Sequence, residues 1–303
     1  MKKSFFSTAL LGLAAATVIG CNTTKQTSTA KASQEIFMEK TNCKTIALTK
    51  GQMDVYDFGS VKLHAFKTND LITDECFLVE KNGKAFLIES PSFYDNIAEL
   101  KKYIAELGVE YVGTVIAYHA AGASFMKGKS VYSTKNADDY NHNGDGAGLV
   151  NKFAGAFGEA FDKSIYTTTD FIEGDTLTLA GVELKIKRSS EAFDIEIPEI
   201  NVAYIHMLGH DVHSIVAGSG HADAQIAQLD DFIARNISLI LTSHYTVENL
   251  EDVRTKIAYL ADLKNIAVKN ADASAFKTAV QEKYPKYSGL NYLDMTAGMF
   301  YAK

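Results

Sequence analysis

Residues 112–128, VGTVIAYHAAGASFMKG, decide the fold of this chain. The first half of the stretch, residues 112–117, is apolar and rich in β-branched side chains, as is typical of a strand buried on both faces of a sheet. The apolar run stops at His119, and small residues follow. Ligands of α/β proteins bind beside the carboxyl ends of such strands, where loops leave a rigid sheet. His119 is therefore a candidate functional residue.

The segments before this stretch predict a sheet and a covering helix. Gly108 ends an apolar helical repeat made by Ile97, Leu100, Ile104 and Leu107. Four short alternating strands precede the helix, and Lys81-Asn82-Gly83 is a hairpin turn signal between the last two. The strands are expected at residues 52–58, 61–66, 74–80 and 84–89. A helix between strands makes this half of the chain α/β.

The second half of the chain repeats this plan. We expect hairpin strands at residues 176–179 and 182–187, a strand at 200–208, a helix at 223–235 and a short apolar strand at 238–242. A helix at residues 247 to about 263 and a terminal amphipathic stretch follow. The strand at 238–242 ends in Ser243-His244, so each half has a histidine at the end of a buried strand, His119 in the first and His244 in the second.

A histidine cluster lies between these two ends. If the strand at 200–208 stays extended, His206 and His210 face one side and Asp211 and His213 the other. Gly209 is expected to break the strand and leave His210, Asp211 and His213 in a loop. Neutral imidazoles and carboxylates are common ligands of zinc and related metals. The alternative is a polar loop in which the histidines bond to backbone groups.

The order of these elements resembles the metallo-β-lactamase fold family. The resemblance rests on Tyr118-His119, a glycine-rich insertion, the hairpin GDTLTL at 174–179, Gly209-His210-Asp211 and LILTSH at 239–244, and it covers about residues 51–263. It implies a four-layer α/β/β/α sandwich in which two mixed sheets are flanked by helices.

The family's metal-binding motif is incomplete in this chain. Its His-x-His-x-Asp-His pattern falls on His119, Ala121, Ala123 and Ser124, so only the first histidine is present. The resemblance therefore implies that the usual dinuclear zinc site is lost. The aspartate that often holds the attacking water in relatives falls on Ala123.

Later positions of the family fit this chain better. Residues 190–210 resemble an alkylsulfatase-like branch, in which Glu191 is the first acidic ligand and the second falls on His210 or Asp211. His244 matches the last histidine. The implied metal ligands are thus His119, Glu191, His210, Asp211 and His244, and they could hold one zinc or other divalent ion. No catalytic residue is assigned.

Two functions follow from the incomplete motif. The favoured one is a repurposed or non-catalytic binding protein that keeps the fold. The alternative is a metal-dependent hydrolase of a small ester, sulfate or lactone with a reduced, mononuclear site, because three protein ligands and an open position suffice for zinc catalysis. The sequence identifies neither a small-molecule partner nor a protein partner.

The N-terminus predicts export and lipidation. Two lysines, an apolar run and Val18-Ile19-Gly20-Cys21 resemble a bacterial lipoprotein signal, with Cys21 as the acylated residue, and the alternative is an ordinary signal peptide with an incidental cysteine. We expect a signal peptide at 1–20, a flexible tether at 21–45 and the folded domain at 46–303. Asn22 favours a lipid anchor in the outer membrane, with the domain facing the periplasm or the surface.

The amino-acid composition limits the classes of partner that we expect this protein to bind. The chain has 303 residues, of which 47% are apolar, and a formal net charge of −7. The acidic balance argues against nucleic acid and against anionic lipid surfaces, so the lipid anchor is the expected membrane contact. Cys43 and Cys76 form either a disulfide or two buried thiols in an oxidising compartment.

The glycine-rich middle of the chain offers a weaker signal. Residues 139–145, DYNHNGD, resemble the start of a calcium-binding loop, but Val150 stands where a bidentate glutamate is expected. We therefore expect a solvated, turn-rich insertion at residues 137–163, with a helix-like segment at 150–161 toward its end.

Overall fold

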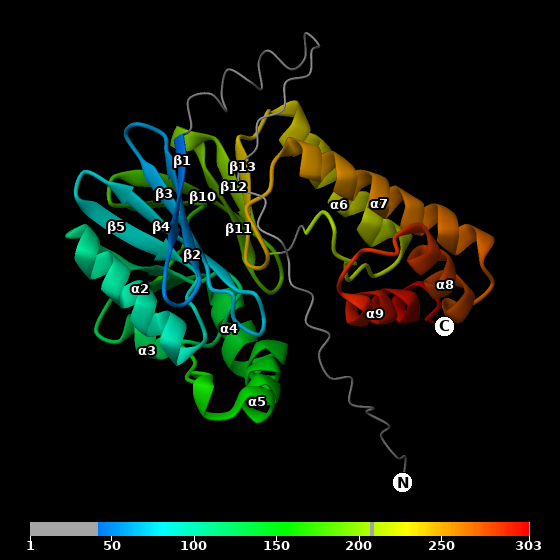
Figure 1. Cartoon of the computed structure of the whole chain (residues 1–303), viewed down its shortest axis with the longest axis horizontal. Helices are drawn as coiled ribbons and strands as arrows, with labels where there is room; N and C mark the ends of the chain where they lie inside the picture. The colour runs from blue at the N-terminus through cyan, green and yellow to red at the C-terminus, as the bar shows by residue number, and fades with distance from the viewer. Residues whose placement is uncertain (1–41, 207–208, 303) are drawn as a thin grey trace.

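Two mixed sheets form the centre of the molecule (Figure 1). The computed structural model describes residues 42–206 and 209–302. The first sheet holds eight strands in chain order; the first five pair antiparallel and the last three add in parallel. They are β1 (Asn42–Ala47), β2 (Gln52–Asp57), β3 (Lys62–Lys67), β4 (Glu75–Lys81), β5 (Lys84–Ile88), β6 (Glu110–Val115), β7 (Val131–Ser133) and β8 (Asp170–Phe171).

The second sheet has five strands in the order β13-β12-β11-β10-β9. All neighbours pair antiparallel except β12 and β13, which are parallel. The carboxyl ends of β12 and β13 therefore lie at the same edge. The strands are β9 (Thr176–Leu179), β10 (Val182–Arg188), β11 (Phe193–Ile197), β12 (Val202–Ile205) and β13 (Leu239–Thr242).

Helices cover the outer faces of both sheets. Figure 1 shows α2 and α3 along the first sheet, and α6 beside α7, with α8 and α9 near the C-terminus. The α-helices are α2 (Tyr94–Leu107), α3 (Ala123–Met126), α4 (Lys135–Asn143), α5 (Asp145–Phe157), α6 (Ser219–Ala234), α7 (Leu250–Lys269), α8 (Ala273–Lys283) and α9 (Leu290–Phe300), with 3₁₀ turns at Gly158–Ala160 and Pro198–Ile200. No helix among the described residues is long and apolar enough to cross a membrane.

Alternation along the strands separates the core into layers. On β4, Phe77 and Val79 face the second sheet, whereas Cys76 and Leu78 face α2. On β12, Tyr204 faces the first sheet and Ala203 packs under the helices that follow β12. One core thus lies between the sheets and one beneath each helical layer, which makes the four-layer α/β/β/α sandwich that the sequence predicts.

The structure corrects two segment predictions. Strand β1 begins at Asn42, inside the range expected to be a tether at 21–45, so the folded part starts earlier than predicted. The middle segment is helical, not turn-rich: the candidate calcium loop at 139–145 lies in α4 and the first turn of α5. There the Asp139 carboxylate accepts a hydrogen bond from the Asn143 amide, one helical turn away, at 2.8 Å.

Of the two alternatives left open for Cys43 and Cys76, the disulfide is wrong. Cys43 lies on β1 and Cys76 on β4, with β2 and β3 between them. Neighbouring strands are about 4.8 Å apart, so the two residues are separated by at least roughly 14 Å, whereas a disulfide needs Cα atoms within about 7 Å. Cys76 is a buried thiol, as the alternative reading held.

Candidate metal centre

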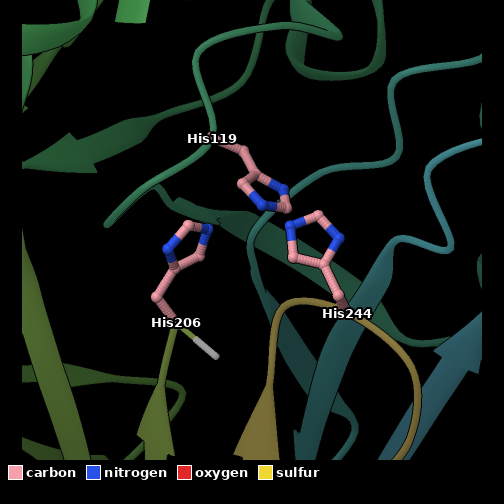
Figure 2. A group of neighbouring side chains, drawn as sticks. All are labelled: His119, His206 and His244. Carbon is pink, nitrogen blue, oxygen red and sulfur yellow. The ribbon is translucent and has the colours of Figure 1, made fainter. Parts of the chain in front are cut away.

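Three histidines from three loops converge at one edge of the sandwich. His119 follows β6, His206 directly follows β12, and His244 follows β13. One nitrogen of each ring lies within 4.8 Å of the others, and Figure 2 shows each ring turning a nitrogen toward the space between them. The parallel pairing of β12 and β13 explains why His206 and His244 emerge together.

Hydrogen bonding determines which nitrogen of His244 can bind a metal. The Nδ1 atom lies 3.1 Å from the carbonyl oxygen of Ile72. A carbonyl only accepts, so Nδ1 carries the proton and the Nε2 lone pair remains open. The Nε2 atom of His119 is buried and has no hydrogen-bond partner among the described residues. An unpaired buried ring nitrogen is the kind of group that a metal ion satisfies.

The third imidazole is held by stacking. The ring of His206 lies flat on Tyr118, with ring centroids 4.5 Å apart and planes 8° apart. Tyr118 is itself fixed because its hydroxyl donates to Asp194 at 2.6 Å, and Gln228 donates to the second oxygen of Asp194 at 2.8 Å. The orientation of His206 is therefore set by packing before any ligand binds.

All three imidazoles are neutral at physiological pH. Burial lowers the pKa of His206 to about 3 and that of His244 to about 4. Burial and then the two neighbouring histidines place the pKa of His119 well below its usual value. Metal ions bind the neutral imidazole, so the donor set fits a zinc-like ion.

A buried carboxylate stands beside the histidines. Asp74 is 2% exposed, and its Oδ1 lies 3.3 Å from Nδ1 of His244 and 3.9 Å from Nδ1 of His119. Neither oxygen accepts a hydrogen bond of normal geometry from the residues that the structure describes. Burial and then the nearby Asp70 raise the pKa of Asp74 well above its usual value, although Ser92 opposes this.

Glu89 fixes the loop that carries His119. Its Oε1 accepts from the backbone N–H groups of Ala117 at 3.0 Å and Tyr118 at 2.9 Å, and its Oε2 accepts from that of His119 at 3.1 Å. Glu89 has a positive φ of 61°, which is rare for a residue other than glycine and costs free energy. The strain places the carboxylate under the loop.

The same carboxylate reaches the other two histidine loops. Tyr204, two residues before His206, donates its hydroxyl proton to Oε1 of Glu89 at 2.8 Å. The Tyr204 hydroxyl also contacts the hydroxyl of Ser243, which directly precedes His244. A single buried network thus connects the three loops and holds their relative positions.

The sequence-predicted ligands separate into different places. His119 and His244 lie in the trio. Glu191 is exposed in the turn before β11. His210 binds Glu248 at 2.8 Å and lies 3.4 Å from Asp252, in a second group of possible ligands. Asp211 is exposed and lines, with His210, a cavity of about 280 Å³.

The sequence analysis did not assign two residues of this site, His206 and Asp74, to the metal ligands or their partners. The strand expected at 200–208 ends at Ile205, so His206 is a strand-end histidine like the other two and not an interior strand residue. Its position at the end of a buried strand, which it shares with His119 and His244, could have identified it from the sequence. Asp74 has no comparable signal in the sequence, because only the antiparallel bridge between Asp74 and His244 brings the two together.

Comparisons with known proteins were made at the levels of sequence and structure. No family model matches the chain, and no curated protein matches it. Among solved structures, a double mutant of the sec-alkyl sulfatase Pisa1 superposes with a TM-score of 0.57 and 14% identity over 92% of this chain. The chain has the metallo-β-lactamase fold.

Other solved structures agree on this fold. Pisa1 from Pseudomonas sp. matches 79% of the chain at 16% identity with a TM-score of 0.53. A metallo-β-lactamase family protein from Thermus thermophilus matches 80% of the chain and 92% of its own length, at 11% identity and a TM-score of 0.54. The chain spans 63% of the length of the alkylsulfatase chain first named.

Proposed function

We propose that this protein binds one divalent transition metal ion through His119, His206 and His244 and uses it in hydrolysis. The observation that carries the proposal is the convergence of three neutral ring nitrogens, one of which is buried without a partner. Three protein ligands and one open position are typical of catalytic zinc sites. A bound ion would supply Lewis acidity at that open position.

At the trio, the chain's own residues support one metal ion and not two. Ala121 and Ala123 carry no ligand atoms, and the predicted ligands Glu191 and Asp211 are exposed elsewhere. His206 supplies the third nitrogen that the sequence analysis did not assign to the site. This favours the mononuclear hydrolase over the non-catalytic binding protein that the incomplete motif suggested.

The substrate class is proposed from the fold. Solved structures that share the fold include an alkylsulfatase and a metallo-β-lactamase family protein. We propose a small ester, sulfate or lactone as the substrate. The side chains of His119 and His244 are 12% and 16% exposed, so the trio lies near the surface of the fold, and we propose that a small substrate reaches it there.

We further propose that the protein is a lipoprotein of the bacterial outer membrane, anchored through Cys21. This part of the proposal rests on the sequence, since residues 1–41 lie outside the described part of the chain.

Elemental analysis of protein purified without chelator tests the proposal. We expect about one equivalent of zinc, iron or manganese per chain. His119→Ala, His206→Ala and His244→Ala should each lose most of it, because two remaining nitrogens hold such an ion poorly. His221→Ala, which removes an exposed histidine of α6, is the matched control and should retain the metal. A wild-type protein without metal, whose melting temperature does not change when zinc is added, would overturn the proposal.

A further inference from the structure

We propose that Asp74 is the carboxylate partner of the metal-binding imidazoles, which orients His119 and His244 through their Nδ1 atoms and leaves Nε2 of each free for the metal. The inference rests on the proposed metal site and adds a positioning residue to it. Metal-bound histidines usually donate their second N–H to a carboxylate or carbonyl, which fixes the ring and makes the ligand more basic.

The position of Asp74 fits this role. Its Oδ1 faces both rings, at 3.3 Å from Nδ1 of His244 and 3.9 Å from Nδ1 of His119. The single Nδ1 proton of His244 lies between two acceptors, Oδ1 of Asp74 and the carbonyl oxygen of Ile72, which is 3.1 Å from Nδ1 and two residues before Asp74. One short loop therefore contacts the Nδ1 side of both rings, opposite the side on which their other nitrogens converge (Figure 2).

The backbone of Asp74, and not its carboxyl group, makes the hydrogen bonds that hold the loop. Its N–H donates to Asp70 at 3.3 Å, and its carbonyl accepts from the N–H of Thr68 at 3.1 Å and the hydroxyl of Thr68 at 2.7 Å. The two side-chain oxygens are fully buried and accept no hydrogen bond of normal geometry from the described residues, and the side chain of Ser92 is the one polar group that acts on them against burial. Burying such a group without a partner destabilises a fold, so its presence beside the ligand trio points to a functional role.

The neighbouring residue provides a matched control. Glu75 is also fully buried, and both of its carboxylate oxygens lack partners among the described residues. Successive side chains of a strand point to opposite faces, and Glu75 begins β4, so its carboxylate points away from the side that Asp74 faces. Replacing either acid by its amide removes a buried, unpaired carboxylate, but only one of the two replacements affects the histidines.

The experiment compares wild type, Asp74→Asn and Glu75→Gln after removal of metal. Each protein is titrated with cobalt(II) in competition with a chromophoric chelator, the visible spectrum of the cobalt form is recorded, and the melting temperature is measured without metal. We expect Asp74→Asn to bind cobalt about 10- to 100-fold more weakly than wild type, as is typical when an outer partner of a ligand is lost. Its cobalt spectrum should keep the wild-type band positions, because the three ligands are unchanged.

Two further readouts separate this role from a structural one. The metal-free Asp74→Asn protein should melt at the same temperature as wild type or higher, since the substitution removes a buried carboxyl group that lacks a hydrogen bond of normal geometry. Glu75→Gln should bind cobalt as wild type does. The inference is overturned if Asp74→Asn binds cobalt like wild type, if its spectrum changes as for a lost ligand, or if Glu75→Gln weakens binding equally. If wild type itself binds no metal, the proposed function fails first, and the two failures are distinguishable.

Discussion

His210 illustrates how one residue can resemble a metal ligand and serve another purpose. Its Nδ1 lies 2.8 Å from Glu248, which is 1% exposed, and 3.4 Å from Asp252. The hydrogen bond to Glu248, together with the charges of Glu248, Asp252 and Asp211, outweighs burial and raises the pKa of His210 to about 9. Protonated His210 therefore joins the loop after Gly209 to the start of α7 as an ion pair.

This ion pair predicts a pH dependence of stability. The folded-state pKa lies above the unfolded value of about 6.5, so the stabilisation is complete below about pH 6.5 and is lost as the pH rises through about 9. In urea unfolding, the free-energy difference between wild type and His210→Asn should be larger near pH 6 than near pH 10. A difference that is independent of pH would contradict the assignment.

Single residues of the site differ in how far the sequence could predict them. His119 and His244 end apolar runs, and that local pattern suffices to find them. His206 follows the same rule, but the apolar Met207 and Leu208 extended the predicted strand past it. Asp74 acquires its role only through contacts between the two halves of the chain, which no local pattern encodes.

At the scale of the elements, the relative positions of the three histidine loops depend on hydrogen bonds to Glu89. Replacing Glu89 should therefore lower both the stability of the fold and its affinity for metal. Glu89→Ala leaves three backbone N–H groups and the Tyr204 hydroxyl without their acceptor. At about 1–3 kcal/mol for each buried unpaired group, the free energy of unfolding should fall by roughly 3 kcal/mol or more. Metal binding should weaken as well, because the loop of His119 loses its support.

Denaturant unfolding and cobalt titration measure the two effects. Glu89→Gln is the milder companion variant, since it keeps one side-chain oxygen as an acceptor, and it should fall between wild type and Glu89→Ala in both measurements. Wild-type stability in Glu89→Ala would contradict the role given to this network.

The elements themselves were predicted where the pattern is strong. The alternating strands before residue 90 and the helix that ends at Gly108 appear near the predicted bounds. The helix-like segment predicted at 150–161 overlaps most of α5, whereas α4 and the start of α5 were missed because Gly144, Gly146 and Gly148 resemble turn signals, and glycine inside a helix is unfavourable. Packing on the rest of the domain overrides this local preference.

At the scale of the whole molecule, the order of strands and helices was enough to predict the four-layer sandwich. The site was harder to predict, because it forms where loops from both sheets meet. Of the three histidines, only His119 lies in the segment that resembles the short metal-binding motif, and the other two lie in loops far from it in the sequence. Only the assembled sandwich brings them together.

The proposed lipid anchor also belongs to the scale of the whole molecule, and fractionation tests it. The full chain, expressed in a Gram-negative bacterium, should be found in the membrane fraction and label with a palmitate analogue. Cys21→Ser should abolish both, because one thiol carries the anchor. Cys43→Ser, on β1, is the matched control and should remain in the membrane. Membrane recovery of Cys21→Ser would contradict the proposal.

The central claim is that three histidines from three loops hold one metal ion. Anomalous diffraction at the zinc absorption edge, from crystals of the wild-type protein grown with zinc, tests it most directly. We expect one strong peak per chain, bounded by His119, His206 and His244, with Nε2 of His119 and His244 facing it. A peak only at His210, Glu248 and Asp252, or no peak at all, would contradict the account.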